Sequence, residues 1–344
     1  MALDVATPAA VVDLDRLEAN LARWQEYADG AGLRNRPHIK THKCVEIARR
    51  QIELGAAGVT CQTLYEAEVM LEAGIGDVLI PYNLVGGRKL EQLSLLLGRG
   101  SVRVSADDES LLPGLAGAAV DAGRELGVLV DCDTGLGRTG VATPDEAARL
   151  AARIAGTDGL RFDGLATYPS PPRATAFLEE AASLLERRGL APGTISAGGT
   201  PAMWQSGELR PVVNEYRVGT YVFHDRATVA AGAAALDDVA LTIAATVVHR
   251  RDGRAILDAG SKALSSDPGP AEGFGTVLEA PSSTLVRLNE EHGYLDLAGG
   301  DRLELGQQVR IVPNHACVAV NLFEELTVVR DGQVVTRWPV ARGR

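Results

Sequence analysis

The chain has 344 residues, 46% of them hydrophobic and 4% aromatic, which is enough for one large domain and one smaller domain. Its formal net charge of −11, without long runs of one sign, argues against a nucleic-acid partner and against an anionic membrane surface, which both attract basic faces. We find no apolar run of membrane-spanning length and no signal-like leader, so we expect a cytoplasmic protein whose four separated cysteines are reduced thiols.

Strand-like runs alternate with helix-like segments through the first two thirds of the chain. After an extended opening at 7–12, the spacing of apolar residues predicts a helix over 15–31 and a short strand over 37–39. Further strands are expected at 58–61, 77–81, 102–105, 127–132, 162–168, 194–198 and 216–221. Crossover helices are expected at 64–73, 89–97, 109–126, 144–155 and 174–188. This alternation predicts an α/β fold, a parallel (β/α)8 barrel of the TIM type over residues 12–229.

From about Ala230 the pattern changes to β-type segments without long helices between them. These segments are expected at 239–249, 254–258, 284–288, 308–312 and 326–338, the last around an Asp331-Gly332 turn. They predict a second, smaller antiparallel β domain over residues 230–344, to which residues 1–11 add. The alternative to the barrel is a doubly wound open sheet, but no Gly-x-Gly-x-x-Gly follows the first strand.

Lysine is scarce in this chain, yet Lys40 and Lys43 both stand in the run Arg-Pro-His-Ile-Lys-Thr-His-Lys at 36–43. Because arginine supplies nearly all the other basic residues, a lysine here indicates chemistry that a guanidinium cannot perform, the attack of an amine on a carbonyl. A strand at 37–39 would place Lys40 at its carboxyl end, where α/β folds carry catalytic groups. A basic surface loop is the alternative interpretation of this run alone.

Glycine-rich loops follow the seventh and eighth expected strands, as Ser-Ala-Gly-Gly-Thr-Pro at 196–201 and Arg-Val-Gly-Thr-Tyr at 217–221. Backbone N–H groups with no Cβ in the way, together with a threonine hydroxyl, suit a phosphate. One such loop is more often a tight turn, whereas two neighbouring loops opposite a strand-end lysine favour a phosphate site. The combination suggests pyridoxal 5'-phosphate held as a Schiff base.

His315-Ala316-Cys317 is the second informative site. In a strand, residues two apart point to the same face, so the side chains of His315 and Cys317 could both reach one ion. A packed histidine beside a buried thiol is the alternative, because cysteine is often simply buried.

Several motifs in fixed order resemble the D-threonine aldolase / D-serine dehydratase family, which shares the alanine racemase-type barrel (fold-type III). They are the run at 36–43, Asp-Thr-Gly-Leu-Gly-Arg-Thr-Gly at 133–140, the two Gly-Thr loops, Asp-Ala-Gly-Ser-Lys at 258–262, Glu-His-Gly at 291–293 and Pro-Asn-His-Ala-Cys at 313–317. The resemblance extends from about Thr7 to Leu326. It implies a pyridoxal-phosphate enzyme that acts on a small D-amino acid and forms a homodimer.

The resemblance also implies roles for individual residues. Lys40 would be the Schiff-base lysine, Arg138 would face the ring region of the cofactor, and Tyr168 would lie near the ring or substrate. The phosphate would be held by Gly198, Gly199, Thr200, Gly219 and Thr220, with Arg217 and Tyr221 nearby. A pairing of Arg217 with the pyridine nitrogen, as in the racemases, is a hypothesis. The family carries His-x-Cys or His-x-Asp as a metal pair, and the imidazole of His315 with the thiolate of Cys317 suits Zn²⁺ better than Mn²⁺ or Mg²⁺.

One departure from the family concerns the loop after Tyr168. Many aldolases have a histidine there that is proposed as a base, whereas here Tyr168 is followed by Pro-Ser-Pro-Pro-Arg at 169–173 and no histidine occurs between His42 and His224. This difference removes one argument for aldol cleavage.

The resemblance therefore implies a lyase dependent on pyridoxal phosphate and zinc that acts on D-3-hydroxy amino acids. We expect dehydration to a 2-oxo acid and ammonia ahead of retro-aldol cleavage to glycine and an aldehyde. A racemase, which needs no metal pair, and a non-catalytic pyridoxal-phosphate-binding protein, which would usually lack the second domain, are the remaining alternatives.

Overall fold

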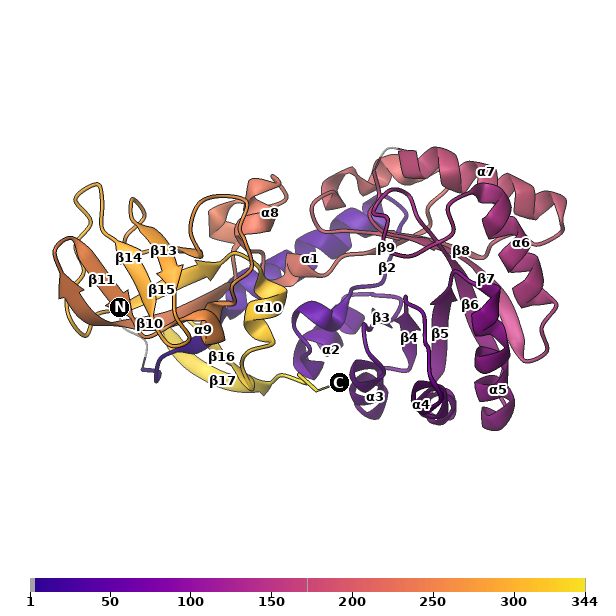
Figure 1. Cartoon of the computed structure of the whole chain (residues 1–344), viewed down its shortest axis with the longest axis horizontal. Coiled ribbons are helices and arrows are strands. Elements are labelled where there is room, and N and C mark those ends of the chain that lie inside the picture. The colour runs from indigo at the N-terminus through magenta and orange to yellow at the C-terminus, as the bar shows by residue number, and fades with distance from the viewer. Residues whose placement is uncertain (1–3, 172, 344) are drawn as a thin grey trace. The chain divides into compact units, whose positions relative to one another are not determined.

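The computed structural model describes residues 4–171 and 173–343 (Figure 1). Pro172, which belongs to the loop after Tyr168, lies outside the described residues, as do residues 1–3 and 344 of the expected β domain. The chain forms two compact units. We call the unit built from Trp24–Lys40 and Ile47–Gly219 the barrel unit, and the unit built from residues up to Arg23, Thr41–Glu46 and Thr220–Arg342 the β unit. The expected boundaries at 12–229 and 230–344 stay a prediction.

Eight parallel strands form the sheet of the barrel unit within the described residues. They are β2 (Arg34–Asn35), β3 (Val59–Thr60), β4 (Asp77–Ile80), β5 (Ser101–Ala106), β6 (Leu126–Cys132), β7 (Leu160–Thr167), β8 (Thr194–Gly198) and β9 (Glu215–Arg217), in the order β2-β9-β8-β7-β6-β5-β4-β3. A single parallel bridge between His38 and Thr60 joins the two ends of this order. The predicted (β/α)8 fold class is therefore confirmed.

Two strands end earlier than the sequence predicts, and both ends carry expected site residues. The strand expected at 37–39 is β2 with one isolated bridge at His38, because Pro37 has no N–H for the ladder. Lys40 lies in the following 3-10 turn η1 (Ile39–Thr41). The strand expected at 216–221 is β9, and Thr220 and Tyr221 belong to a second 3-10 turn, η4 (Thr220–Val222). Both turns follow the carboxyl ends of strands.

Helices cover the outer side of the parallel strands (Figure 1). They are α2 (Val45–Glu53), α3 (Leu64–Glu72), α4 (Gly87–Leu97), η2 (Glu109–Leu111), α5 (Leu112–Ala122), α6 (Pro144–Ala155), α7 (Arg173–Arg187) and η3 (Met203–Leu209). Helix α1 (Leu14–Gly30) precedes them in the chain and is divided between the two units. A capping box between Thr143 and Glu146 starts α6, as the Thr-Pro-Asp-Glu sequence predicts. The helix expected over 109–126 stops early because Gly123 adopts a left-handed conformation that ends α5.

The β unit contains a nine-stranded sheet within the described residues. Its strands are β1 (Ala9–Asp13), β10 (Leu241–Arg251), β11 (Arg254–Leu257), β12 (Gly275–Val277), β13 (Thr284–Leu288), β14 (Gly293–Asp296), β15 (Gln308–Pro313), β16 (Glu325–Arg330) and β17 (Gln333–Pro339). The pairing is antiparallel except where β1 lies parallel to β16. The hairpin turn expected at Asp331-Gly332 is confirmed, since both residues have positive φ. The sequence did not predict β12 and β14.

Short helices complete the β unit. They are α8 (Arg226–Ala230), η5 (Leu236–Asp238), α9 (Ser261–Leu264) and α10 (Ala316–Val320). Across the described part of the chain, none of the helices has both the length and the apolar character that crossing a membrane requires.

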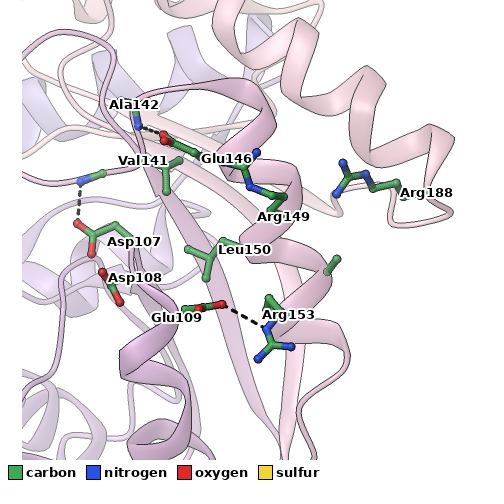
Figure 2. A pocket seen from close by; sticks show the side chains of 12 residues that line it. Asp107, Asp108, Glu109, Val141, Ala142, Glu146, Arg149, Leu150, Arg153 and Arg188 are labelled. Carbon is green, nitrogen blue, oxygen red and sulfur yellow. Dashed lines mark hydrogen bonds and ion pairs between the residues drawn. The ribbon is translucent and has the colours of Figure 1, made fainter.

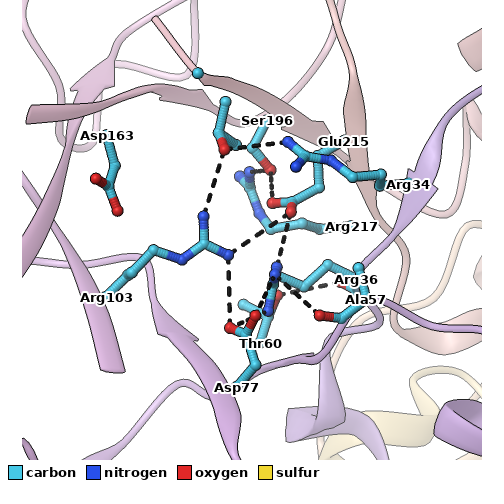
Figure 3. A network of polar contacts seen from close by, with 12 residues as sticks. Arg34, Arg36, Ala57, Thr60, Asp77, Arg103, Asp163, Ser196, Glu215 and Arg217 are labelled. Carbon is cyan, nitrogen blue, oxygen red and sulfur yellow. Dashed lines mark hydrogen bonds and ion pairs between the residues drawn. The ribbon is translucent and has the colours of Figure 1, made fainter. Parts of the chain in front are cut away.

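A network of buried charges lies inside the barrel (Figure 3). The Nε atom of Arg36 donates to the fully buried carboxylate of Glu215 at 2.8 Å, and Nη1 of Arg36 donates to Asp77 at 2.9 Å. Arg103 contributes a second guanidinium 3.8 Å from Glu215. Burial acts to raise the pKa of Glu215, but the positive charges of Arg36 and Arg103 outweigh it, so this pKa lies below its ordinary value. The network links the strand regions β2, β4, β5 and β9.

The first prediction concerns this network. Glu215→Gln should lower the free energy of unfolding by about 3–5 kcal/mol, because it removes the fully buried carboxylate that faces Arg36 and Arg103 and leaves Asp77 as their remaining partner. Because the pKa of Glu215 is lowered on folding, its contribution to stability is present above the unfolded pKa of about 4.3 and is lost as the pH falls through the folded pKa.

Urea unfolding at pH 7 measures this difference. The control is Glu325→Gln, which removes an exposed ion pair with Arg337 and should cost no more than about 1 kcal/mol. Equal losses of unfolding free energy in the two variants would mean that the buried network contributes no more to stability than an exposed ion pair.

Candidate active site

Lys40 and Arg217 both lie beside His38 in the barrel unit. His38 accepts a long hydrogen bond from the backbone N–H of Lys40 at 3.4 Å, and its Nε2 lies 3.3 Å from Oε1 of Gln62. Burial holds the pKa of His38 well below its ordinary value, and the positive charges of Lys40 and Arg217 lower it further. The imidazole is therefore neutral at pH 7. The sequence analysis did not assign a role to His38, although this residue stands in the same run as Lys40.

Lys43, the second lysine of the run, has a structural partner in the β unit. Its Nζ donates to Oδ1 of Asn321 at 2.7 Å, and its carbonyl accepts from the N–H of Ala341 at 2.7 Å. The segment Thr41–Glu46 is thereby tied to the β unit at both the side chain and the backbone of Lys43. An amine held by an amide in this way is a poor candidate for covalent chemistry.

Arg217 is held at the carboxyl ends of two neighbouring strands. Its Nη1 donates to the hydroxyl of Ser196 at 2.5 Å, and its Nη2 donates to the carbonyl of Thr167 at 2.9 Å. The hydroxyl of Ser196 in turn donates to Glu215 at 2.8 Å, as Figure 3 shows. Burial lowers the pKa of Arg217 from its ordinary value, and Glu215 and Asp131 oppose this shift. The orientation of Arg217 thus depends on the buried charge network of the barrel.

The glycines of the loop after β8 are required by close packing. A Cβ on Gly198 would lie 2.7 Å from the carbonyl oxygen of Arg217, and Gly199 has a φ of +128°. Their N–H groups already have protein acceptors: Gly198 donates to Ser170 Oγ and Gly199 donates to the carbonyl of Arg217, both at 3.0 Å. Ser170 also donates back to the carbonyl of Gly198 at 3.0 Å.

Threonine hydroxyls are the better candidates for holding a phosphate. Thr200 is buried, and its Oγ1 accepts from the N–H of Gly219 at 3.2 Å, which joins the two glycine-rich loops and leaves the hydroxyl proton available to a ligand. Thr220, the next residue after Gly219, belongs to η4 together with the buried Tyr221. Two glycine loops joined by a threonine, on the same unit as Lys40, fit a phosphorylated cofactor.

Arg138 and Tyr168 lie together at the mouth of the barrel unit. The guanidinium carbon of Arg138 is 5.6 Å from the centroid of the Tyr168 ring. On another side the ring approaches Gly199, where a Cβ would lie 3.4 Å from Cε2 of Tyr168. The Asp133 carboxylate shapes the loop that carries Arg138 by accepting from the N–H groups of Gly135 and Leu136 at 2.7 and 2.9 Å. These predicted residues are therefore brought to one region.

A cavity of about 710 Å³ on the outer side of the barrel unit holds none of the predicted site residues (Figure 2). It lies between the loop after β5 and helix α6, and it carries both signs of charge, including an ion pair of 3.3 Å between Glu109 and Arg153. Both side chains of this pair are more than two thirds exposed, so solvent screens the pair. The lining of this cavity therefore resembles an ordinary solvated surface rather than a second reactive site.

The His315-Ala316-Cys317 motif does not lie in a strand, and that expectation was wrong. Strand β15 ends at Pro313, His315 is the residue that precedes α10, and Cys317 lies in the first turn of that helix. The carboxylate of Asp225 accepts from the N–H of Ala316 at 2.9 Å and so fixes the start of the helix. The motif nevertheless brings its two side chains together, because a hydrogen bond joins His315 to Cys317.

The surroundings of this pair fit a metal site in the β unit. Nδ1 of His315 lies 3.0 Å from the carboxylate of Asp267, which leaves Nε2 as the nitrogen for an ion. The hydrogen bond with Cys317 raises the pKa of His315 to about 9, burial opposes this shift, and Asp267 adds to it. Sγ of Cys317 is 3.1 Å from the hydroxyl of Thr41 and 3.7 Å from that of Thr220.

Two protein ligands are what the described residues offer here, since they contain no group of three or more His, Cys, Asp or Glu side chains arranged to hold an ion. A two-ligand site leaves coordination positions open for water and for a substrate. An imidazole with a thiolate, oriented by a carboxylate on the imidazole, suits Zn²⁺.

Comparisons with known proteins agree with these features. Residues 12–227 match the alanine racemase N-terminal domain, and residues 240–329 match the putative serine dehydratase domain. The chain is 35% identical to a D-threonine aldolase from Arthrobacter sp., covering 98% of this chain and 93% of that protein. It is also 35% identical to the D-threo-3-hydroxyaspartate dehydratase of Delftia sp. (strain HT23), covering 97% of each.

The chain belongs to the D-threonine aldolase / D-serine dehydratase family. A solved structure of a D-threo-3-hydroxyaspartate dehydratase mutant in the metal-free form is 32% identical, with a TM-score of 0.91 and full coverage of both chains. The family resemblance expected from the motifs is thereby confirmed, and it includes proteins named for both reactions that the sequence analysis weighed.

The sequence analysis assigned no role to several residues that contact the predicted ones. Ser170 supports the loop of Gly198, Asp267 orients His315, and Thr41 contacts Cys317. Each of these partners is distant in sequence or stands outside the charged residue types that mark a site, so composition and spacing could not identify them.

The second prediction separates the two lysines. After borohydride reduction of the cofactor-loaded protein, mass spectrometry should find the covalent label on Lys40, and Lys40→Arg should abolish it because a guanidinium cannot form an imine. Lys43→Ala should keep the label, since the Lys43 amine is held by Asn321. A label on Lys43 or Lys262 would contradict this assignment of the site.

The third prediction concerns the phosphate. Thr200→Val should weaken retention of pyridoxal phosphate about 10- to 100-fold, because it removes a hydroxyl donor to a dianion worth about 1.5–3 kcal/mol. Thr200→Ser, which keeps the hydroxyl, is the matched control and should bind nearly as well as the natural protein. Equilibrium dialysis measures both variants, and unchanged retention in Thr200→Val would place the phosphate elsewhere.

Proposed function

We propose that this protein is a lyase dependent on pyridoxal phosphate and zinc that dehydrates D-3-hydroxy amino acids to a 2-oxo acid and ammonia. The observation that carries the proposal is the pair formed by His315 and Cys317, oriented by Asp267 and contacted by Thr41, the residue that directly follows Lys40. The residue that contacts Cys317 is thus the immediate sequence neighbour of the proposed Schiff-base lysine. Membership of a family that includes lyases supports the same function.

Lys40 is the residue we assign to proton transfer. The cofactor, when bound, supplies an electron sink that makes the substrate α-proton removable. Nζ of Lys40 takes that proton, which requires a neutral amine. The neutral imidazole of His38, next to the backbone of Lys40, adds no charge to these surroundings. Arg138 and Tyr168, which lie against each other, are the residues we assign to the region of the cofactor ring.

His315 and Cys317 are the residues we assign to the metal. Zinc, when bound, supplies charge stabilisation that makes a hydroxyl group a tolerable leaving group. Asp267 keeps Nδ1 of His315 engaged, so that Nε2 is presented to the ion in one tautomer. A soft thiolate in the second position favours zinc over Mn²⁺ or Mg²⁺, which remain the weaker candidates.

The loop after Tyr168 favours dehydration over aldol cleavage. Retro-aldol cleavage needs a group that removes the proton of the substrate hydroxyl, and this loop contains no histidine. Its serine, Ser170, is engaged on both sides with the backbone of Gly198. Aldol cleavage to glycine and an aldehyde is the second candidate, because a relative of equal identity is named as an aldolase.

Two other functions fit less well. A racemase on the same barrel has no use for a carboxylate-oriented histidine beside a cysteine thiol. A non-catalytic pyridoxal-phosphate-binding protein has no use for a second unit that carries this pair.

We further propose that the protein is a homodimer located in the cytoplasm. The homodimer rests on family resemblance. The cytoplasmic location rests on the free cysteines Cys44, Cys61, Cys132 and Cys317.

The fourth prediction tests the proposed reaction and its metal dependence together. The cofactor-loaded enzyme, given D-serine, D-threonine or D-3-hydroxyaspartate, should release 2-oxo acid and ammonia. Chelation, or His315→Ala, should leave the visible absorbance of the bound cofactor intact while lowering turnover by at least about 100-fold, since metal stabilisation is worth several kcal/mol.

The control is His249→Ala, which removes an exposed histidine of β10 and should leave turnover unchanged. Glycine and an aldehyde as the products would favour the aldolase candidate. Full release of 2-oxo acid after chelation would reject the metal dependence, whereas racemised substrate without 2-oxo acid or glycine would favour a racemase.

A further inference from the structure

Thr41 occupies an unusual position in the β unit. Its side chain is fully buried, although the residue before it is the proposed Schiff-base lysine. Its Oγ1 lies 3.1 Å from Sγ of Cys317, well within hydrogen-bond distance for sulfur. The hydroxyl of Thr220 lies on the same sulfur at the longer distance of 3.7 Å. Thr41 therefore makes the shorter of two hydroxyl contacts to the proposed metal ligand.

The direction of this hydrogen bond follows from the chemistry of the ligand. A cysteine binds zinc as a thiolate, which has no proton and acts only as an acceptor. A threonine hydroxyl has one proton to give, so Thr41 must donate to Cys317 when the metal is bound. Such a bond restricts the rotamer of Cys317 and stabilises its negative charge, in the way that partners behind metal ligands commonly do.

The backbone on the carboxyl side of Thr41 is fixed within the same unit. Lys43 donates from its amine to Asn321, which lies one residue beyond the end of α10, and accepts at its carbonyl from Ala341. Helix α10 itself carries Cys317 in its first turn. The segment Thr41–Glu46 and the metal-ligand helix are thereby connected at two places, the Thr41 hydroxyl and the Lys43 amine, so the donor has little freedom to move away from the sulfur.

We propose that Thr41 is a positioning residue for the metal site, whose hydroxyl holds the Cys317 thiolate in the orientation that binds the ion. This inference rests on the proposed function, since it takes His315 and Cys317 as the metal ligands. It assigns the residue after Lys40 to the metal rather than to the cofactor. The short turn η1 would then position both Lys40 and the hydroxyl that contacts the metal ligand.

The fifth prediction tests Thr41 by metal affinity rather than by activity. Zn²⁺ binding to the cofactor-loaded protein is measured by competition with a chromophoric chelator, and zinc-edge X-ray absorption reports the Zn–S contact, which lies at about 2.3 Å for a bound thiolate. Thr41→Val keeps the size of the side chain and removes the donor, so zinc affinity should fall about 10- to 100-fold. Thr41→Ser restores the hydroxyl and should restore most of the affinity.

Two further variants make the result decisive. Thr327→Val alters a buried threonine of β16 in the same unit, and its hydroxyl makes no hydrogen bond with the described residues, so zinc affinity should not change. Should Thr41→Val fail to fold, as judged by circular dichroism, Thr41→Ala carries the same expected loss. Cofactor absorbance should remain intact in every variant that folds.

Three outcomes would overturn the inference. Equal zinc affinity in Thr41→Val and the natural protein would show that the hydroxyl does not position the ligand. An equal loss in Thr327→Val would show a general effect of packing. Absence of any sulfur contact in the natural zinc-loaded protein would instead reject Cys317 as a ligand, and with it both the metal part of the proposed function and the role of Thr41.

Discussion

The buried carboxylate of Glu215 is the constraint on which the barrel unit depends. A charge in the barrel interior is tolerated only with partners, and Arg36 and Arg103 provide them from positions next to β2 and within β5. Asp77 of β4 accepts a hydrogen bond from Arg36, so two carboxylates face the two guanidinium groups. Between the segments of β2 and β3, the described residues form one isolated bridge, from His38 to Thr60, and the ion pairs of Arg36 add side-chain contacts to it. The same carboxylate reaches Arg217 through Ser196, so one buried charge supports both the closed barrel and the functional end of its strands.

Much of this fold could be predicted from the sequence because apolar residues recur at different spacings in its strands and in its helices. Strands such as β13 (Thr284–Leu288) and helices such as α6 lie where alternation and capping residues place them. Where the prediction was wrong or incomplete, contacts between residues distant in the sequence are the cause. Residues 315–317 alternate like a strand but start a helix, because the Asp225 carboxylate, distant in the sequence, accepts from the N–H of Ala316. The strands β12 and β14 are too short to show a period, and they form because β15, β11 and β13 pair with them.

Some residues of the candidate site can be recognised from short sequence motifs, whereas others are identified only from the folded structure. Lysine, glycine-threonine loops and a His-x-Cys pair are recognisable because their chemistry restricts the residue type at each position. Their supporting partners are not restricted in that way. A carboxylate behind His315 or a hydroxyl beside Cys317 can come from any loop that reaches it, and here they come from Asp267 and Thr41. Sequence reasoning therefore points to the candidate reactive groups and misses the groups that orient them.

Ser170 lies in the loop that follows Tyr168 and supports the neighbouring glycine-rich loop. Its hydroxyl accepts from the N–H of Gly198 and donates to the carbonyl of the same residue, so both of its hydrogen-bonding functions serve the loop after β8. A neutral serine hydroxyl is a weak base, so this side chain is poorly suited to take a proton from a substrate hydroxyl. In the proposed dehydration, that hydroxyl leaves rather than loses its proton, which requires a positive charge and not a base. The thiolate and imidazole of the β unit are the residues suited to hold such a charge, and the proline-rich loop is then free to act as a support for the glycine-rich loop.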